Sequence, residues 1–128
     1  EAACEMDVRF TTMDEAERLE RTIRGLKPFD ARVRLEISGD INRPPMERTP
    51  GTIAIFEKAR ELSAVLGRNL DETQVGGASD GNFIGALGVP VLDGLGIEGD
   101  GAHADHEHIL IDGIAERGAM IAGLILGM

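Results

Sequence analysis

The sequence predicts an α/β protein in which an α+β piece is followed by an α/β layered piece. Apolar and polar residues alternate in two short segments of the first forty residues, with a helical pattern between them. A connector with glycine and adjacent prolines, "GDINRPPMERTP", follows. Beyond it, helical patterns alternate with short apolar segments, which favours a layered domain. We therefore expect a boundary inside the connector.

The first forty residues predict a strand–helix–strand unit. Residues 2–10, "AACEMDVRF", alternate as a half-buried strand does. Thr12 and Glu15 form a capping box that begins a helix, and Pro28 ends it. Residues 33–38, "VRLEIS", alternate again and predict a second strand. The apolar stripe expected on the helix is Ala16, Leu19, Ile23 and Leu26.

Four further elements are expected after the connector. Thr49 as N-cap and Pro50 at the first helical position predict a helix that ends at Gly67. Ser79 or Asp80 is expected to cap a brief helix through Leu87. Residues 89–96, "VPVLDGLG", predict a short buried strand, and Asp112 is expected to cap the last helix. The predicted stripes are Ile55, Ala59, Leu62 and Leu66 on the first helix, and Ile114, Ile121 and Ile125 on the last.

Composition excludes several classes of function. The formal charge of -10 argues against a nucleic acid or an anionic membrane as partner. Aromatic residues make up 3% of the chain, too few for base stacking. The most apolar run, residues 119–128, is too short to span a bilayer. The lone Cys4 demands no oxidising compartment, so we expect a cytoplasmic protein. Because the sequence begins with Glu1 and not Met, we expect a processed chain or a piece of a longer one.

The stretch "GDGAHADHEH", residues 99–108, contains every histidine of the chain. His103, His106 and His108, with carboxylates between them, could supply metal ligands, since imidazole and carboxylate suit zinc. A solvated polar edge explains the same residues. Three ligands this close in sequence rarely converge on one tetrahedral site, so a self-contained three-histidine centre is disfavoured.

Arg43 lies in the connector beside two prolines. A guanidinium on a stiff backbone can hold a carboxylate with two parallel hydrogen bonds. An exposed hinge residue is the competing interpretation.

Three motifs together, "NRPPMERTP", "GGASDGNFIGALGVPVLDGLG" and "GDGAHADHEHILID", resemble the C-terminal part of a family of zinc-dependent metallopeptidases. That family includes glutamate carboxypeptidase, acetylornithine deacetylase and succinyl-diaminopimelate desuccinylase, and the glutamate carboxypeptidase-like branch is the most similar. The resemblance implies that residues 1–44 are the second half of a ferredoxin-like lid domain, which usually forms a homodimer. Residues 45–128 would be the C-terminal part of the catalytic domain.

The resemblance also implies roles for individual residues. His103 matches the last metal ligand of a two-zinc centre, and Glu107 matches an acidic position close behind it. Arg43 matches the arginine that holds the substrate's carboxylate. The turn that borders the substrate corresponds to Gly77, Ala78, Ser79 and Asp80. His106 and His108 match no ligand position, and Asn82 has no assigned role.

The family's other zinc ligands, its general base and its lid histidine match no residue of this sequence. We therefore expect the C-terminal portion of a dizinc hydrolase that cleaves an amide or peptide bond at a C-terminal or N-acyl amino acid. Its substrate would be an amino-acid or peptide-like molecule with a carboxylate. This chain alone, with one ligand for two zinc ions, would be inactive. The alternative is a non-catalytic dimerisation or interaction module.

Overall fold

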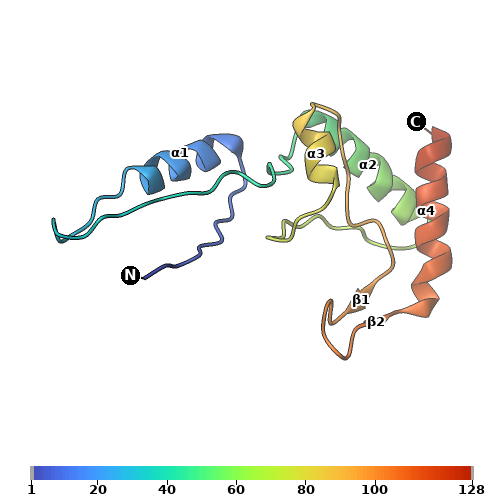
Figure 1. The fold of residues 1–128 in the computed structure, drawn as a ribbon. Coiled ribbons are helices and arrows are strands. Elements are labelled where there is room, and N and C mark those ends of the chain that lie inside the picture. Colours follow the sequence, from blue (N-terminus) through green and yellow to red (C-terminus); the bar gives the residue numbers. More distant parts are fainter. Residues whose placement is uncertain (1, 128) are drawn as a thin grey trace. The chain divides into compact units, whose positions relative to one another are not determined.

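The computed structural model describes residues 2–127. Contacts divide the chain into two units: the residues up to Glu47 together with Val75–Val89, and Arg48–Gln74 together with the residues from Pro90 onward. The elements are α1 (Met13–Arg24), α2 (Pro50–Val65), α3 (Gly81–Ala86), β1 (Gly99–Asp100), β2 (His108–Ile109), a 3-10 turn (Ile111–Gly113) and α4 (Ile114–Gly127) (Figure 1). This helix-rich arrangement with a small two-stranded sheet is compatible with a piece of an α/β domain.

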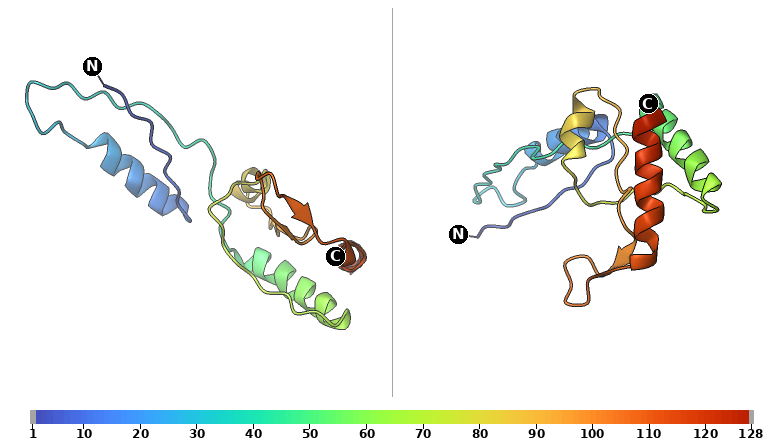
Figure 2. Two further views of the ribbon diagram at one scale, coloured as in Figure 1. Left: turned by 90° about the horizontal axis from the view of Figure 1, so that it is seen from below. Right: turned by 90° about the vertical axis from the view of Figure 1, so that its right-hand side faces the viewer.

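In the first unit, α1 begins where the capping box predicts. The Thr12 hydroxyl accepts a hydrogen bond from the backbone N–H of Glu15 at 3.3 Å. Both ends of α1 also hold the segment that follows the helix. Arg24 donates to the carbonyl of Gly39 at 2.8 Å, and the backbone N–H of Met13 donates to the carboxylate of Glu47 at 2.8 Å. This segment therefore runs alongside α1, as Figures 1 and 2 show.

The predicted strands at residues 2–10, 33–38 and 89–96 are wrong, since none of these segments is a strand. A strand is stabilised by hydrogen bonds to a neighbouring strand, and an alternating sequence cannot supply that neighbour. Val33 and Leu35 are 55% and 46% exposed, so the face expected to be buried remains open. The domain boundary at residue 44 stays a prediction, because a division by contacts assigns no segment to a lid or a catalytic domain.

The second unit is built on the packing of α2 against α4, which lie side by side (Figures 1 and 2). Its core contains Ala59 of α2 with Met120 and Leu124 of α4. The partly buried side chains packed around this core are Leu62, Leu70, Leu92 and Leu95. Gly123 permits the close approach of the two helices, since a Cβ there would lie 3.1 Å from a methyl carbon of Leu62.

Both helices of this unit form as predicted, with changes in detail. The Thr49 hydroxyl caps α2 by accepting from the N–H of Thr52 at 3.2 Å. The predicted stripe on α4 is wrong, because Met120 and Leu124 are buried while Ile114, Ile121 and Ile125 are 36–69% exposed. Asp112 lies within the 3-10 turn, so it does not cap α4.

The two strands form a short antiparallel hairpin in which Gly99 pairs with Ile109 and Asp100 pairs with His108. Each strand of this hairpin is two residues long. Within residues 2–127, no helix is both long and apolar enough to cross a membrane.

Candidate functional site

The connector places Arg43 against α3 in the first unit. Its Nη1 lies 3.3 Å from Oδ1 of Asp80, and its guanidinium carbon lies 4.8 Å from the centroid of the Phe83 ring. The Arg43 side chain is 32% exposed, whereas that of Asp80 is 98% exposed. A cation over an aromatic face is stabilised by the quadrupole of the ring. Arg43 is therefore held against Phe83, while the carboxylate of Asp80 that it contacts remains in solvent.

Hydrogen bonds define the turn that precedes α3. The Ser79 hydroxyl accepts from the N–H of Gly81 at 2.9 Å, and the N–H of Ser79 donates to Oδ1 of Asn82 at 3.0 Å. Asn82 also donates from Nδ2 to the carbonyl of Pro44 at 2.8 Å. The structure thus brings the predicted turn and Arg43 together through Asp80 and Asn82.

The earlier part of this turn is open. Gly77 and Ala78 are exposed, and a Cβ at Gly77 would meet no atom within 4 Å. The carbonyl of Gly76 accepts a hydrogen bond from Arg9 at 2.7 Å, which connects the turn to the N-terminal segment of the same unit. A small molecule can therefore approach the backbone of the turn at Gly77 and Ala78.

His103 lies in the loop between β1 and β2, in the second unit. Its φ of 67° is in the left-handed region, and Gly101, two residues earlier, has a φ of 75°. The backbone N–H of His103 donates to Oε2 of Glu107 at 3.3 Å. Glu107 therefore holds the main chain of His103, which leaves the exposed imidazole available for another partner.

The loop between β1 and β2 contains imidazole and carboxylate groups, which are donors that suit zinc. Within residues 2–127, no three His, Cys, Asp or Glu side chains converge as a metal-binding group. Nδ1 of His108 lies 3.0 Å from the carbonyl oxygen of His106, so this ring nitrogen has a backbone partner. A tetrahedral zinc site needs at least three protein ligands. The described residues of this chain do not form such a site.

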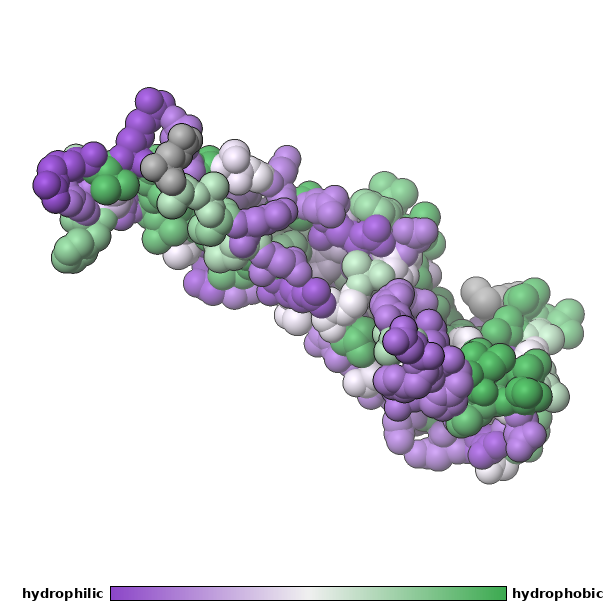
Figure 3. Space-filling view, turned by 60° about the horizontal axis from the view of Figure 1, so that its bottom comes forward, coloured by the Kyte–Doolittle hydropathy of each residue, from purple (hydrophilic) through white to green (hydrophobic). Residues whose placement is uncertain are grey.

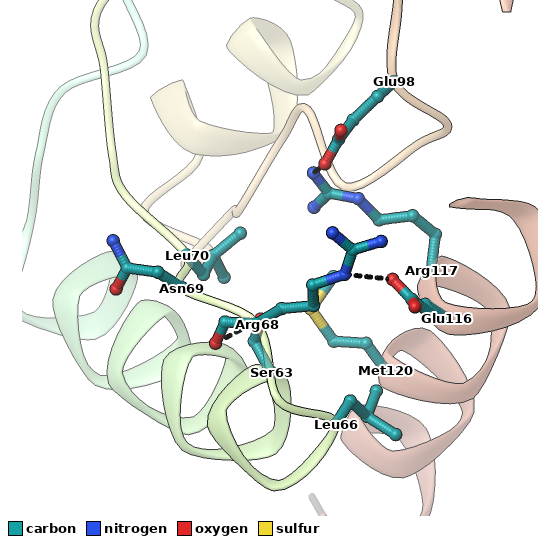
Figure 4. A pocket seen from close by; sticks show the side chains of 9 residues that line it. All are labelled: Ser63, Leu66, Arg68, Asn69, Leu70, Glu98, Glu116, Arg117 and Met120. Atoms are coloured by element: carbon teal, nitrogen blue, oxygen red, sulfur yellow. Dashed lines mark hydrogen bonds and ion pairs between the residues drawn. The ribbon is translucent and has the colours of Figure 1, made fainter. Parts of the chain in front are cut away.

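A pocket in the second unit lies between α2, α4 and the segments that follow α2 and precede β1 (Figure 4). Arg68 pairs with Glu116 at 2.6 Å, and Arg117 pairs with Glu98 at 2.6 Å. The hydrogen bond to Glu116 raises the pKa of Arg68 above its ordinary value. The lining residues are Ser63, Leu66, Arg68, Asn69, Leu70, Glu98, Glu116, Arg117 and Met120. Each charged side chain is paired with another in the same lining, so ion pairs connect α4 to the segments that follow α2 and precede β1.

Sequence reasoning missed Phe83 and the role of Asn82. One signal was present, since an asparagine three residues after a serine at a helix start can accept from the serine N–H. The stacking of Arg43 on Phe83 had no such signal, because these residues are forty positions apart.

The chain matches the model of peptidase family M20/M25/M40 over residues 4–127. It therefore belongs to this family, which is a family of metallopeptidases. No curated protein and no solved structure matches the chain.

Proposed function

We propose that this chain is the C-terminal portion of a dizinc metallohydrolase that resembles glutamate carboxypeptidase. The enzyme would cleave an amide or peptide bond at a C-terminal or N-acyl amino acid. Membership of the M20/M25/M40 family supports peptide-bond hydrolysis. The observation that favours a carboxylate-bearing substrate is the guanidinium of Arg43, which lies over the Phe83 ring and, among residues 2–127, pairs only with the exposed carboxylate of Asp80.

In this proposal, Arg43 binds the carboxylate of the substrate. A guanidinium presents two parallel N–H groups to a carboxylate, and stacking on a ring restricts its plane. A substrate carboxylate would replace the contact with Asp80, which holds Arg43 by one bond at 3.3 Å. The exposed backbone of Gly77 and Ala78 would border the substrate beside Arg43.

His103 is proposed as one zinc ligand, with the other ligands supplied by parts of the protein outside this chain. Glu107 would fix the position of His103 through its backbone N–H. Zinc supplies a Lewis acid and lowers the pKa of water in such enzymes. Because the described residues contain no complete metal group, we propose that the 128-residue chain alone is inactive.

The same proposal includes a homodimer formed through residues 1–44. Several large apolar side chains in this segment are at least 46% exposed, which suits a surface that a second copy covers. They are Met6, Leu26, Phe29, Val33 and Leu35.

Two substitutions in the full-length enzyme test this function. His103→Ala should lower zinc content, measured by inductively coupled plasma mass spectrometry, and abolish hydrolysis. Arg43→Lys should raise KM by about 10- to 100-fold with kcat retained, because a charge-assisted bidentate pair is lost.

His106→Ala and Arg34→Lys are the matched controls, and both should behave like the parent enzyme. His106 is an exposed histidine of the same loop, and Arg34 is an exposed arginine of the first unit that pairs with Glu36 at 2.6 Å. Full zinc content in His103→Ala would exclude that residue as a ligand. An unchanged KM in Arg43→Lys would exclude its role with the carboxylate.

A further inference from the structure

Asn82 joins two segments that are far apart in the sequence. It lies in the first turn of α3 and is half-buried. Its Nδ2 donates to the carbonyl of Pro44 at 2.8 Å, and its Oδ1 accepts from the backbone N–H of Ser79 at 3.0 Å. The carbonyl of Pro44 can only accept and the N–H of Ser79 can only donate, so the two bonds fix the orientation of the amide.

The bond to Pro44 acts on a stiff part of the chain. Pro44 and Pro45 have fixed φ angles, and a residue before proline is restricted to extended conformations. Arg43 precedes Pro44, so its backbone has little freedom of its own. A bond to the Pro44 carbonyl therefore fixes where the Arg43 side chain leaves the main chain.

The next residue of α3 contacts the other end of Arg43. Phe83 lies under the guanidinium at 4.8 Å, while Asn82 holds the adjoining backbone. Consecutive residues of one helix thus contact the charged group of Arg43 and the carbonyl of Pro44, the residue that follows it. Gly85, further along α3, lies beside Met46, where a Cβ would make an ordinary contact of 3.7 Å with Cγ of Met46.

We propose that Asn82 is a positioning residue for carboxylate recognition, because it fixes the Arg43 segment to the turn at residues 77–80. This inference rests on the proposed role of Arg43 with the substrate's carboxylate. Asn82 itself does not contact the substrate. Its loss should therefore weaken the binding of substrates with a free carboxylate and leave the chemical step unchanged.

The test compares Asn82→Asp with the parent full-length enzyme on two substrates. One substrate has a free carboxylate next to the scissile bond, and the other has a carboxamide at the same place. Aspartate has nearly the same shape and can accept from Ser79, but it cannot donate to the Pro44 carbonyl. We expect KM for the carboxylate substrate to rise about tenfold, with kcat within about twofold and KM for the carboxamide unchanged.

Asn69→Asp is the matched control, because Nδ2 of Asn69 also donates a hydrogen bond, to Asp71 at 3.1 Å, on an exposed segment. It should leave both KM values unchanged. Asn82→Ser retains an acceptor for the Ser79 N–H and replaces Asn82→Asp if that variant does not fold. In Arg43→Lys/Asn82→Asp, KM should equal that of Arg43→Lys alone.

Three results would overturn the role of Asn82. These are an unchanged KM for the carboxylate substrate, an equal rise for both substrates, and an additive effect in the double variant. The first result, with a raised KM in Arg43→Lys, would leave the proposed function intact. An unchanged KM in Arg43→Lys would instead contradict the proposed function itself.

Discussion

Gly101 adopts a φ of 75° immediately before the loop that contains His103. A Cβ at this position would lie 2.7 Å from Cδ2 of the His106 ring and 3.2 Å from Cα of Glu107. The first distance is shorter than real contacts of a Cβ, and the second involves backbone that cannot rotate away. Both the conformation and the space at Gly101 therefore require glycine.

We predict that Gly101→Ala lowers the free energy of unfolding of the full-length protein by more than the ~1–2 kcal/mol cost of a left-handed alanine. Gly94→Ala is the matched control, since Gly94 has a φ of 74° and no atom within 4 Å of its Cβ position. Urea unfolding of the two variants and of the parent protein measures how much free energy of unfolding each substitution removes. Equal losses of unfolding free energy in Gly101→Ala and Gly94→Ala would show that the His106 ring moves aside at no cost.

Two glycines in the helices are expected to change the stability of the protein in opposite directions when alanine replaces them. Gly51 lies in the first turn of α2, where a Cβ would lie 2.9 Å from Cβ of Pro90 and closer still to its Cγ. Gly118 lies inside α4, and its Cβ position has no atom within 4 Å. A proline ring cannot rotate away, whereas open space accepts a methyl group freely.

We predict that Gly51→Ala destabilises the protein by about 1–3 kcal/mol, the cost of overpacking. Gly118→Ala should stabilise it by up to about 1 kcal/mol, because alanine has the higher helix propensity. Thermal unfolding by circular dichroism measures both changes. A Tm for Gly51→Ala at or above that of the parent would show that α2 is not packed on Pro90 in solution.

The helices could be predicted from local signals, and the strands could not. Thr12 and Thr49 cap α1 and α2 as expected, since a cap depends on residues three positions apart. Residues 2–10 and 33–38 alternate as strands do, but pairing depends on a neighbour that no local pattern specifies. Likewise, the buried face of α4 depends on where α2 packs, so Met120 and Leu124 replace the expected isoleucines.

The same distinction applies to the candidate site. Residues within one turn, such as Ser79 with Asn82 or His103 with Glu107, interact at short sequence separation, so a local pattern can signal such contacts. The contact of Arg43 with Phe83 depends on the path of the connector, which the sequence does not specify. The resemblance named Arg43 and Asp80 separately, and the structure shows that they form a pair.

On the scale of the whole molecule, many large apolar side chains are exposed. The accessible surface is 10261 Å². Two separate domains, each of half the mass of this chain, would each expose about 4,000 Å². The chain therefore exposes more surface than two such domains together. Within residues 2–127, the buried hydrophobic residues are Ala16, Phe56, Ala59, Met120 and Leu124, and many larger side chains are exposed, as the green areas of Figure 3 show.

We therefore predict that the isolated 128-residue chain self-associates. Exposed apolar patches of this kind mark interaction surfaces or aggregation sites. Sedimentation velocity should therefore show a weight-average mass that rises with protein concentration between about 5 and 200 µM. The dye ANS, which binds exposed apolar surface, should also bind to the chain. At the end of α4, Ile125 and Leu126 are 69% and 86% exposed, so Ile125→Lys/Leu126→Lys should reduce both signals. Glu17→Gln, on the exposed face of α1, is the control and should change neither. A monodisperse monomer without ANS binding at 200 µM would show that these side chains are covered within the chain itself.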